Sequence, residues 1–243
     1  MEHKPASINQ TRYVVAELGG VGSYMISTGH VVSGVFDRKI VKRAAARLAQ
    51  RHTVLRTGFS LENGKIWAHL HPSSDLQTHF LTMPDDDFAT FRLHALPLVF
   101  QNMDVSNPAS LARLVVAQGP TRWRFTFAVH HSLCDGFSRG VIHTEFLKLY
   151  VGEELEAVPS YSDYEQPAEL VAKNTAYWHE QVAKMPPPLK FTPDAFQNRG
   201  DEGRGVFQEA VLGKTPTEIR SFLKTIEGSR FGLLAAAYAI TLA

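Results

Sequence analysis

The chain has 243 residues, of which 44% are hydrophobic and 20% charged, a composition typical of a globular domain that is long enough to bury a real core. Its formal net charge of +1 gives no electrostatic footprint for nucleic acid or for an anionic membrane surface. A single cysteine excludes an intrachain disulfide, and residues 1–10 lack the apolar segment of a signal peptide, so we expect a cytoplasmic protein.

The first half of the chain alternates between helix-like and strand-like patterns. Asp37 is placed to cap a helix that runs to about His52. Strands are predicted at 59–61 and 66–70, on either side of Asn63-Gly64, a pair favoured in two-residue hairpin turns.

A second hairpin is predicted from residues 111–117 and 122–129, joined through Gly119-Pro120. Side chains of a strand alternate between its two faces, so its second strand presents one strongly apolar face. That face carries Trp123, Phe125, Phe127 and Val129, and His131 continues it if the strand extends that far.

A helix is predicted after Gly136, because four apolar residues recur at helical spacing before Gly152, which can end it. Those residues are Phe137, Val141, Ile142 and Phe146. The stretch from Pro186 to Gly205 resembles a connector. The apolar run at 231–243 is too short to span a bilayer, which needs roughly 20 residues, and is expected to be a buried helix.

These patterns together favour an α/β (α+β) fold with a mixed sheet covered by helices. We expect a first lobe over residues 1–170, and a connector with the first elements of a second lobe over 171–243.

The segment at 130–136 carries the strongest chemical signal. Adjacent strand residues point apart, so His130 and His131 are poorly placed to share a metal ion, whereas a single histidine suits acid–base chemistry near neutral pH. A buried histidine at a strand end is more often a hydrogen-bonded core residue, and Asp135 can equally be the N-cap of the following helix. Gly136 permits a tight turn or a close approach of substrate. Cys134 is expected to be a small buried residue.

The string HHSLCDGFS at 130–138, which includes Ser138, resembles the HHxxxDGxS signature of the condensation domains of nonribosomal peptide synthetases. Those domains belong to the chloramphenicol-acetyltransferase-like superfamily. Three more segments in the same order are similar to family motifs: RHTVLRTGF at 51–59, SINQTR at 7–12 and YSDY at 161–164. The chain is about half as long as family members, and Thr53, Asn9 and Glu165 depart from the usual residues.

The resemblance implies a chloramphenicol-acetyltransferase-like α/β sandwich whose second lobe is largely missing, and the attack of an amine or hydroxyl on an acyl thioester. His131 would act as the catalytic base or would position the nucleophile. An ion pair between Asp135 and Arg56 would hold the loop. The resemblance implies no metal and no directly bound cofactor, because substrates would be tethered to phosphopantetheine on acyl or peptidyl carrier proteins.

Two other functions stay open at this point. The same fold could use acyl-CoA and a free alcohol or amine, or the chain could be a non-catalytic condensation-like module. Further expected partners are the remaining carboxy-terminal lobe, in the same or another chain, or a second copy of this chain, because the apolar residues of 231–243 would otherwise face water.

Overall fold

The computed structural model describes residues 2–20, 24–72, 76–100, 103–163, 167–187 and 216–242. The chain forms two compact units, Met1–Thr192 and Pro193–Ala243. The first unit contains both sheets and the HHSLCDGFS segment. The second contains helices α7 (Pro216–Thr225) and α8 (Arg230–Leu242). The predicted boundary at residue 170 stays a prediction.

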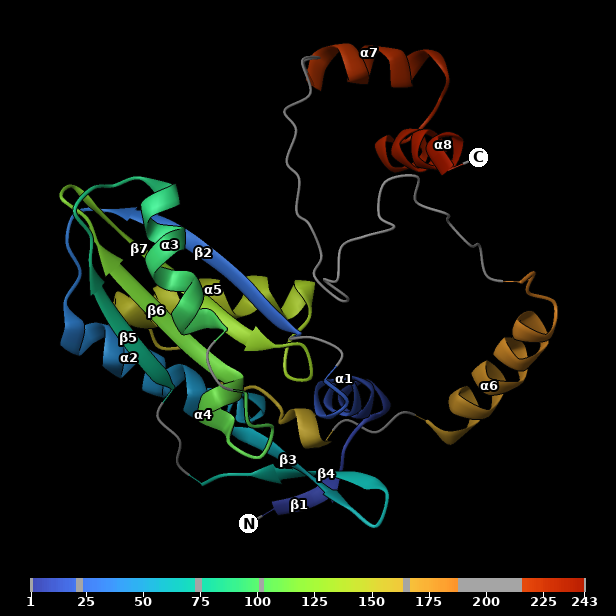
Figure 1. Ribbon diagram of the computed structural model, residues 1–243, viewed down its shortest axis with the longest axis horizontal. Helices are drawn as coiled ribbons and strands as arrows, with labels where there is room; N and C mark the ends of the chain where they lie inside the picture. Colours follow the sequence, from blue (N-terminus) through green and yellow to red (C-terminus); the bar gives the residue numbers. More distant parts are fainter. Residues whose placement is uncertain are drawn as a thin grey trace, which may run out of the picture. The chain divides into compact units, whose positions relative to one another are not determined.

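The larger sheet is mixed, as the sequence predicted (Figure 1). Its strand order is β2-β7-β6-β5, with β2 at Met25–Ser33, β5 at Gln77–Thr82, β6 at Ala112–Gln118 and β7 at Arg122–His130. Strand β7 runs antiparallel to both β2 and β6, whereas β5 and β6 are parallel. The predicted second hairpin is therefore confirmed as β6–β7.

Helices cover both faces of this sheet. On one face, α2 (Arg38–Arg51) and α5 (Gly136–Tyr150) share a buried cluster with β6 and β7. On the other, α3 (Phe88–Val99) packs against a smaller cluster, and it lies in front of the strands in Figure 1. Asp37 caps α2 as predicted, since its carboxylate accepts the N–H groups of Lys39 and Ile40.

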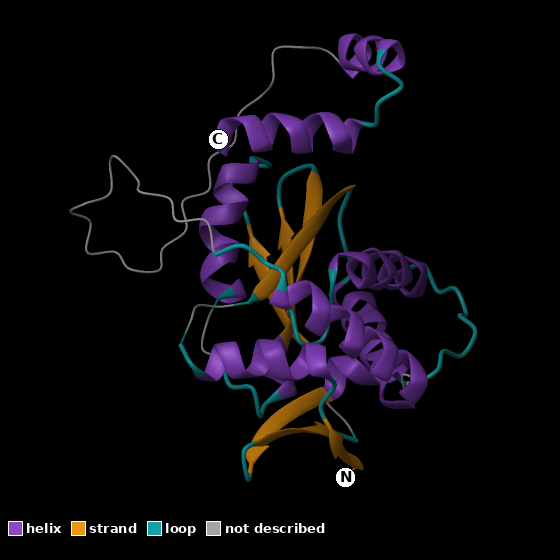
Figure 2. Cartoon of the chain, turned by 90° about the vertical axis from the view of Figure 1, so that its right-hand side faces the viewer, coloured by secondary structure: helices purple, strands orange, loops and turns teal. Residues whose placement is uncertain are grey.

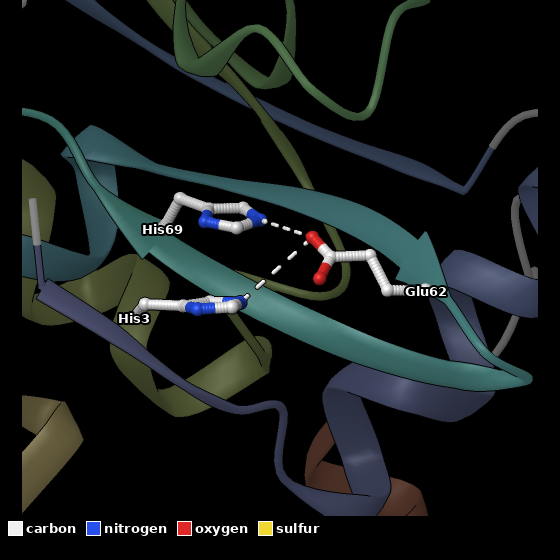
Figure 3. A group of neighbouring side chains, drawn as sticks. All are labelled: His3, Glu62 and His69. Carbon is white, nitrogen blue, oxygen red and sulfur yellow. Dashed lines mark ion pairs between the residues drawn. The ribbon is translucent and has the colours of Figure 1, made fainter.

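A second sheet of three strands lies apart from the first (Figure 2). Its order is β1-β4-β3, with β1 at Glu2–Pro5, β3 at Thr57–Glu62 and β4 at Lys65–Leu70. Asn63 and Gly64 both adopt positive φ angles, 50° and 76°, as a two-residue hairpin turn requires. The outer face of this sheet carries His3 and His69 side by side (Figure 3).

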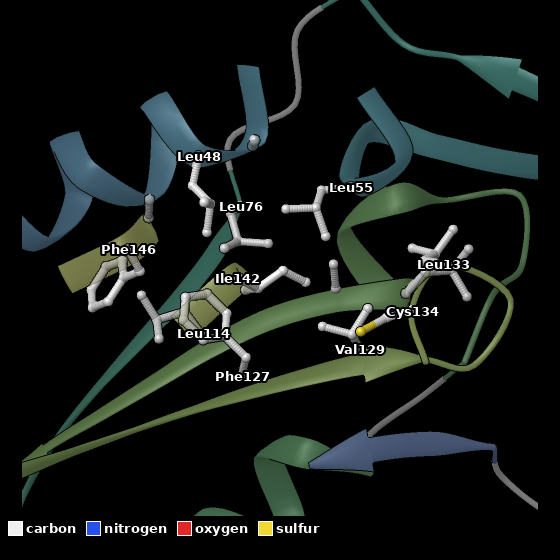
Figure 4. Packing of buried hydrophobic residues seen from close by; sticks show 14 of the residues in the cluster. Leu48, Leu55, Leu76, Leu114, Phe127, Val129, Leu133, Cys134, Ile142 and Phe146 are labelled. Atoms are coloured by element: carbon white, nitrogen blue, oxygen red, sulfur yellow. The ribbon is translucent and has the colours of Figure 1, made fainter. Parts of the chain in front are cut away.

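The core confirms the alternation predicted for β7. Phe125, Phe127 and Val129 belong to the cluster beneath α2 and α5, whereas Ala128 belongs to the cluster beneath α3. Phe127 packs against Phe146 of α5, with ring centroids 5.2 Å apart, in a cluster that also contains Ile142 of α5 and Leu48 of α2 (Figure 4). The apolar face of β7 therefore holds α5, and so the turn that precedes α5, against the sheet.

Local hydrogen bonds explain the beginning of helix α1 (Ile8–Leu18), which the sequence pattern did not predict. The Ser7 hydroxyl accepts the N–H of Gln10, and the Gln10 side chain accepts the N–H of Ser7. This capping box satisfies two donors that would otherwise have no partner within the helix. Two of the residues in the SINQTR motif therefore have a helix-forming role.

The remaining described helices are short or exposed. They are the 3₁₀ turns η1 (Thr53–Arg56) and η2 (Tyr161–Asp163), and helices α4 (Pro108–Leu111) and α6 (Ala168–Ala183). Most of the predicted connector at 186–205 lies outside the described residues. Among the helices that are described, none has the length and apolar character needed to cross a bilayer.

The expected burial of the apolar run at 231–243 is not met within the described residues. Helix α8 forms as predicted and has its main contacts with α7, but Phe231, Leu234, Tyr238 and Ile240 are exposed. In α5, Ile142 and Phe146 are buried, but Phe137 and Val141 are exposed. Helical spacing correctly identified an apolar face of α5, but that face is wider than the sheet covers.

Candidate active site

The site is built on the turn between β7 and α5. His130, the last residue of β7, is fully buried, with Nδ1 2.7 Å from the Ser132 hydroxyl and Nε2 3.4 Å from a carboxylate oxygen of Glu17 on α1. Burial lowers the pKa of His130 despite the opposing effect of Glu17, so the ring is neutral at neutral pH. His130 therefore anchors the turn from inside the core.

His131 points away from that core position into a groove. Its backbone N–H donates to the carbonyl of Tyr24 at 2.8 Å, and its side chain is half-buried. The imidazole stacks on the ring of Tyr13, with centroids 4.2 Å apart and planes 8° apart. Its Nε2 lies 3.4 Å from the Tyr13 hydroxyl, and its Nδ1 has no hydrogen-bond partner among the described residues.

Tyr13 is a site residue that the sequence reasoning missed. It follows the SINQTR motif directly, and the guanidinium of Arg12 lies 4.7 Å from its ring centroid and donates to its hydroxyl at 3.0 Å. The positive charge of Arg12 is attracted to the face of the Tyr13 ring and holds that ring in place. The parallel stacking of Tyr13 on His131 in turn fixes the plane of the imidazole. Its position directly after the SINQTR motif is the sequence feature that could have identified Tyr13 as a site residue.

The predicted ion pair between Asp135 and Arg56 is not formed among the described residues. Asp135 is the N-cap of α5, and its Oδ1 accepts from the Ser138 N–H at 2.8 Å and the Ser138 hydroxyl at 2.7 Å. Arg56 instead donates to the backbone carbonyls of Ala49, His71 and Pro72, at 3.0, 2.5 and 3.0 Å. Asp135 satisfies the first turn of α5 and Arg56 satisfies three backbone carbonyls, so the alternative interpretation of Asp135 as a cap is the correct one.

Asp135→Ala is expected to cost about 0.5–2 kcal/mol of the free energy of unfolding, the usual range for loss of a helix cap. Hydrogen bonds from Ser138 lower the pKa of Asp135, so the cap contributes fully above the ordinary carboxyl pKa and is lost in strong acid. Urea denaturation of the two proteins measures the cost, and Asp135→Asn, which can still cap, is the control. A loss above about 3 kcal/mol would instead indicate a broken buried ion pair.

Gly136 and Cys134 complete the turn. A Cβ atom added at Gly136 would meet no atom within 4 Å, so the backbone does not require glycine there. Cys134 is buried as predicted, and burial raises the pKa of its thiol to about 11. A thiol that stays protonated at neutral pH is a poor nucleophile, which argues against Cys134 as the nucleophile of the site.

The groove beside His131 has a volume of about 720 Å³ and gathers residues from distant segments. Phe137 and Val141 of α5 line it, which accounts for their exposure. The Tyr161 hydroxyl lies 3.1 Å from the Ser7 hydroxyl, so two of the predicted motifs meet at its rim. Tyr164 of the YSDY segment lies outside the described residues.

The RHTVLRTGF segment supports the site through an acidic residue that the sequence reasoning did not identify. Glu145 of α5 accepts from Arg51 Nε at 2.8 Å and lies 2.6 Å from His52 Nε2. Arg51 also donates to the carbonyl of Glu156. The side chains of Arg51 and Glu145 are each only 15% exposed, so the pair is shielded from solvent and links the end of α2 to α5.

Comparisons with known proteins agree on one family. The family model for the Condensation domain matches residues 2–243. Surfactin synthase subunit 1 of Bacillus subtilis (strain 168) is 30% identical over 203 residues, which are 79% of this chain and 6% of that protein. Bacitracin synthase 1 of Bacillus licheniformis is 25% identical over 99% of this chain and 5% of its own length.

Solved structures show the same fold. The starter condensation domain of rhizomide synthetase RzmA matches with a TM-score of 0.62 at 18% identity, over 77% of this chain and 50% of that one. Tallysomycin biosynthesis protein TlmII matches with a TM-score of 0.63 at 17% identity, over 76% and 48%. The chain thus spans about half the length of these structures and a small part of the large synthases.

Proposed function

This chain belongs to the condensation-domain family, and from that premise we propose that it performs condensation-type acyl transfer in the biosynthesis of a nonribosomal peptide or related product. An amine or hydroxyl attacks a carrier-bound acyl or aminoacyl thioester, giving an amide or ester. The observation that carries the proposal is the His131 imidazole, which lines a groove of about 720 Å³ that the other motif segments also line.

The chemistry needs one proton to move. As the nucleophile bonds to the thioester carbon, its proton passes to the His131 imidazole, and the same proton leaves with the thiolate sulfur when the C–S bond breaks. No acyl-enzyme is formed, in keeping with the protonated thiol of Cys134. In the alternative role, His131 positions the nucleophile and stabilises the charged tetrahedral intermediate.

The groove lining favours a carrier-bound donor over free acyl-CoA. The described residues that line it include neither lysine nor arginine, and its charged members are the carboxylates Asp135 and Asp163. The phosphates of CoA carry several negative charges and are usually bound by cationic side chains. A phosphopantetheine arm on a carrier protein presents less charge. Acyl and peptidyl carrier proteins are therefore the proposed partners.

Tyr13→Phe is expected to lower kcat about 2- to 10-fold with little change in KM. The variant keeps the ring that stacks on His131 and loses one hydrogen bond, worth about 0.5–1.5 kcal/mol. Steady-state transfer between loaded carrier proteins measures both constants, and Tyr177→Phe, at an exposed tyrosine of α6, is the control. An equal loss in both variants, or a change confined to KM, would refute a positioning role for Tyr13.

A further inference from the structure

The outer face of the small sheet brings together three groups that can bind a metal. In the antiparallel pair β1–β4, His3 lies directly opposite His69. In the pair β3–β4, Ser60 lies opposite Trp67 and Glu62 opposite Lys65, so Ser60, Glu62 and His69 share that face by strand alternation. The opposite face carries Phe59 and Ile66 into the core, which leaves the three groups on the solvent side.

The possible ligand atoms of the three side chains lie close together. His3 Nε2 and His69 Nε2 each lie 3.8 Å from Glu62 Oε1, and the three possible ligand atoms all lie within 4.8 Å of one another. The two imidazoles stack with centroids 4.6 Å apart and planes 15° apart. Figure 3 shows both rings directing a nitrogen toward the same carboxylate, each from a different strand.

We propose that His3, Glu62 and His69 form a binding site for a divalent transition-metal ion of the Zn²⁺ type. Two imidazole nitrogens and a carboxylate oxygen are a ligand set that Zn²⁺ accepts, with water in the fourth position. Metal–ligand bonds of about 2.0–2.1 Å place tetrahedral ligands about 3.3 Å apart, close to the observed 3.8 Å separations. The two stacked rings must turn away from parallel before both nitrogens can face one ion.

A neighbouring hydroxyl organises two of the three possible ligand atoms. The Ser60 hydroxyl donates to Glu62 Oε1 at 2.6 Å, and its oxygen lies 2.5 Å from His69 Nε2, so it holds these two side chains beside each other. A bound ion would replace the hydrogen bond at Nε2.

The site is also open to solvent. The side chains of His3, Glu62 and His69 are 41%, 46% and 23% exposed, so an ion can enter without the sheet opening. This site is separate from the groove beside His131, whose lining includes none of the three residues. The metal proposal therefore stands or fails independently of the proposed acyl transfer.

The test is calorimetric titration of the 243-residue chain with ZnCl₂ at neutral pH, after removal of any histidine tag and treatment with a chelator. The expected result is a saturable site for one ion per chain. Affinity should fall by at least about tenfold in Glu62→Gln and in His69→Gln. His94→Gln and His179→Gln remove exposed histidines elsewhere and should leave this binding unchanged.

Cobalt provides a second measurement on the same proteins. Co²⁺ in a four-coordinate site absorbs strongly in the visible range, and His3→Gln should abolish that absorption while the circular dichroism spectrum stays that of the parent chain. The proposal is overturned by the absence of saturable Zn²⁺ binding. It is equally overturned if binding persists at parental affinity in both Glu62→Gln and His69→Gln, or depends on His94 or His179 instead.

Discussion

Replacing His131 with alanine is expected to lower the rate of acyl transfer by about 10²–10⁴-fold, the usual contribution of a general base. The fold should survive, because the side chain is half-buried and its hydrogen-bond and ring contacts among the described residues are with Tyr13. Mass spectrometry of product formed from loaded carrier proteins, with the domain in its full-length context, measures the loss. His94→Ala, at an exposed histidine of α3, is the matched control.

His131→Gln separates the two roles proposed for this residue. Glutamine retains hydrogen-bonding groups but takes up no proton at neutral pH. A base predicts that the Gln and Ala variants lose activity equally, whereas a positioning role predicts that Gln restores a substantial part. Turnover within about threefold of the parent in both variants would remove His131 from the mechanism altogether.

Phe146→Ala is expected to destabilise the domain by about 3–5 kcal/mol, as large-to-small changes of buried aromatics do. Phe146 is fully buried, and its ring centroid lies 4.9 Å from that of Phe125 and 5.2 Å from that of Phe127. It joins α5 to β7, so the void would open beneath the helix that follows the catalytic turn.

Phe137→Ala provides the control on the same helix. Phe137 is 84% exposed, so its removal should change the free energy of unfolding by no more than about 0.5 kcal/mol. Denaturant titrations followed by circular dichroism give both values. Similar costs for the two variants would mean that α5 does not pack on the sheet as described.

Local patterns in the sequence predicted much of the fold. The alternation in β7 and the turn pair Asn63-Gly64 act over neighbouring residues, and both are confirmed. The expected burial of Phe231 is not met within the described residues, because an apolar helix face predicts a covering element without identifying it. Where no covering element is present among the described residues, the apolar pattern of a helix does not predict whether its side chains are buried.

The candidate site was also predicted only where its residues are neighbours in the sequence. The turn at 130–136 is contiguous, so its residues could be recognised together. Tyr13 and Glu145 are separated by about a hundred residues from the groups they contact, and no spacing rule connects them. The pairing of Arg56 with Asp135 failed because nearby backbone groups compete for both side chains. His3, Glu62 and His69 meet only through strand register.

The buried thiol of Cys134 allows the opening of the turn at 130–136 to be measured. It is the one cysteine of the chain, it lies between His131 and the helix cap, and its raised pKa keeps it protonated and unreactive while the turn is closed. An alkylating reagent can therefore modify it only during excursions that expose the sulfur. The labelling rate then reports how often the turn opens, and its dependence on denaturant separates local opening from global unfolding without any introduced probe.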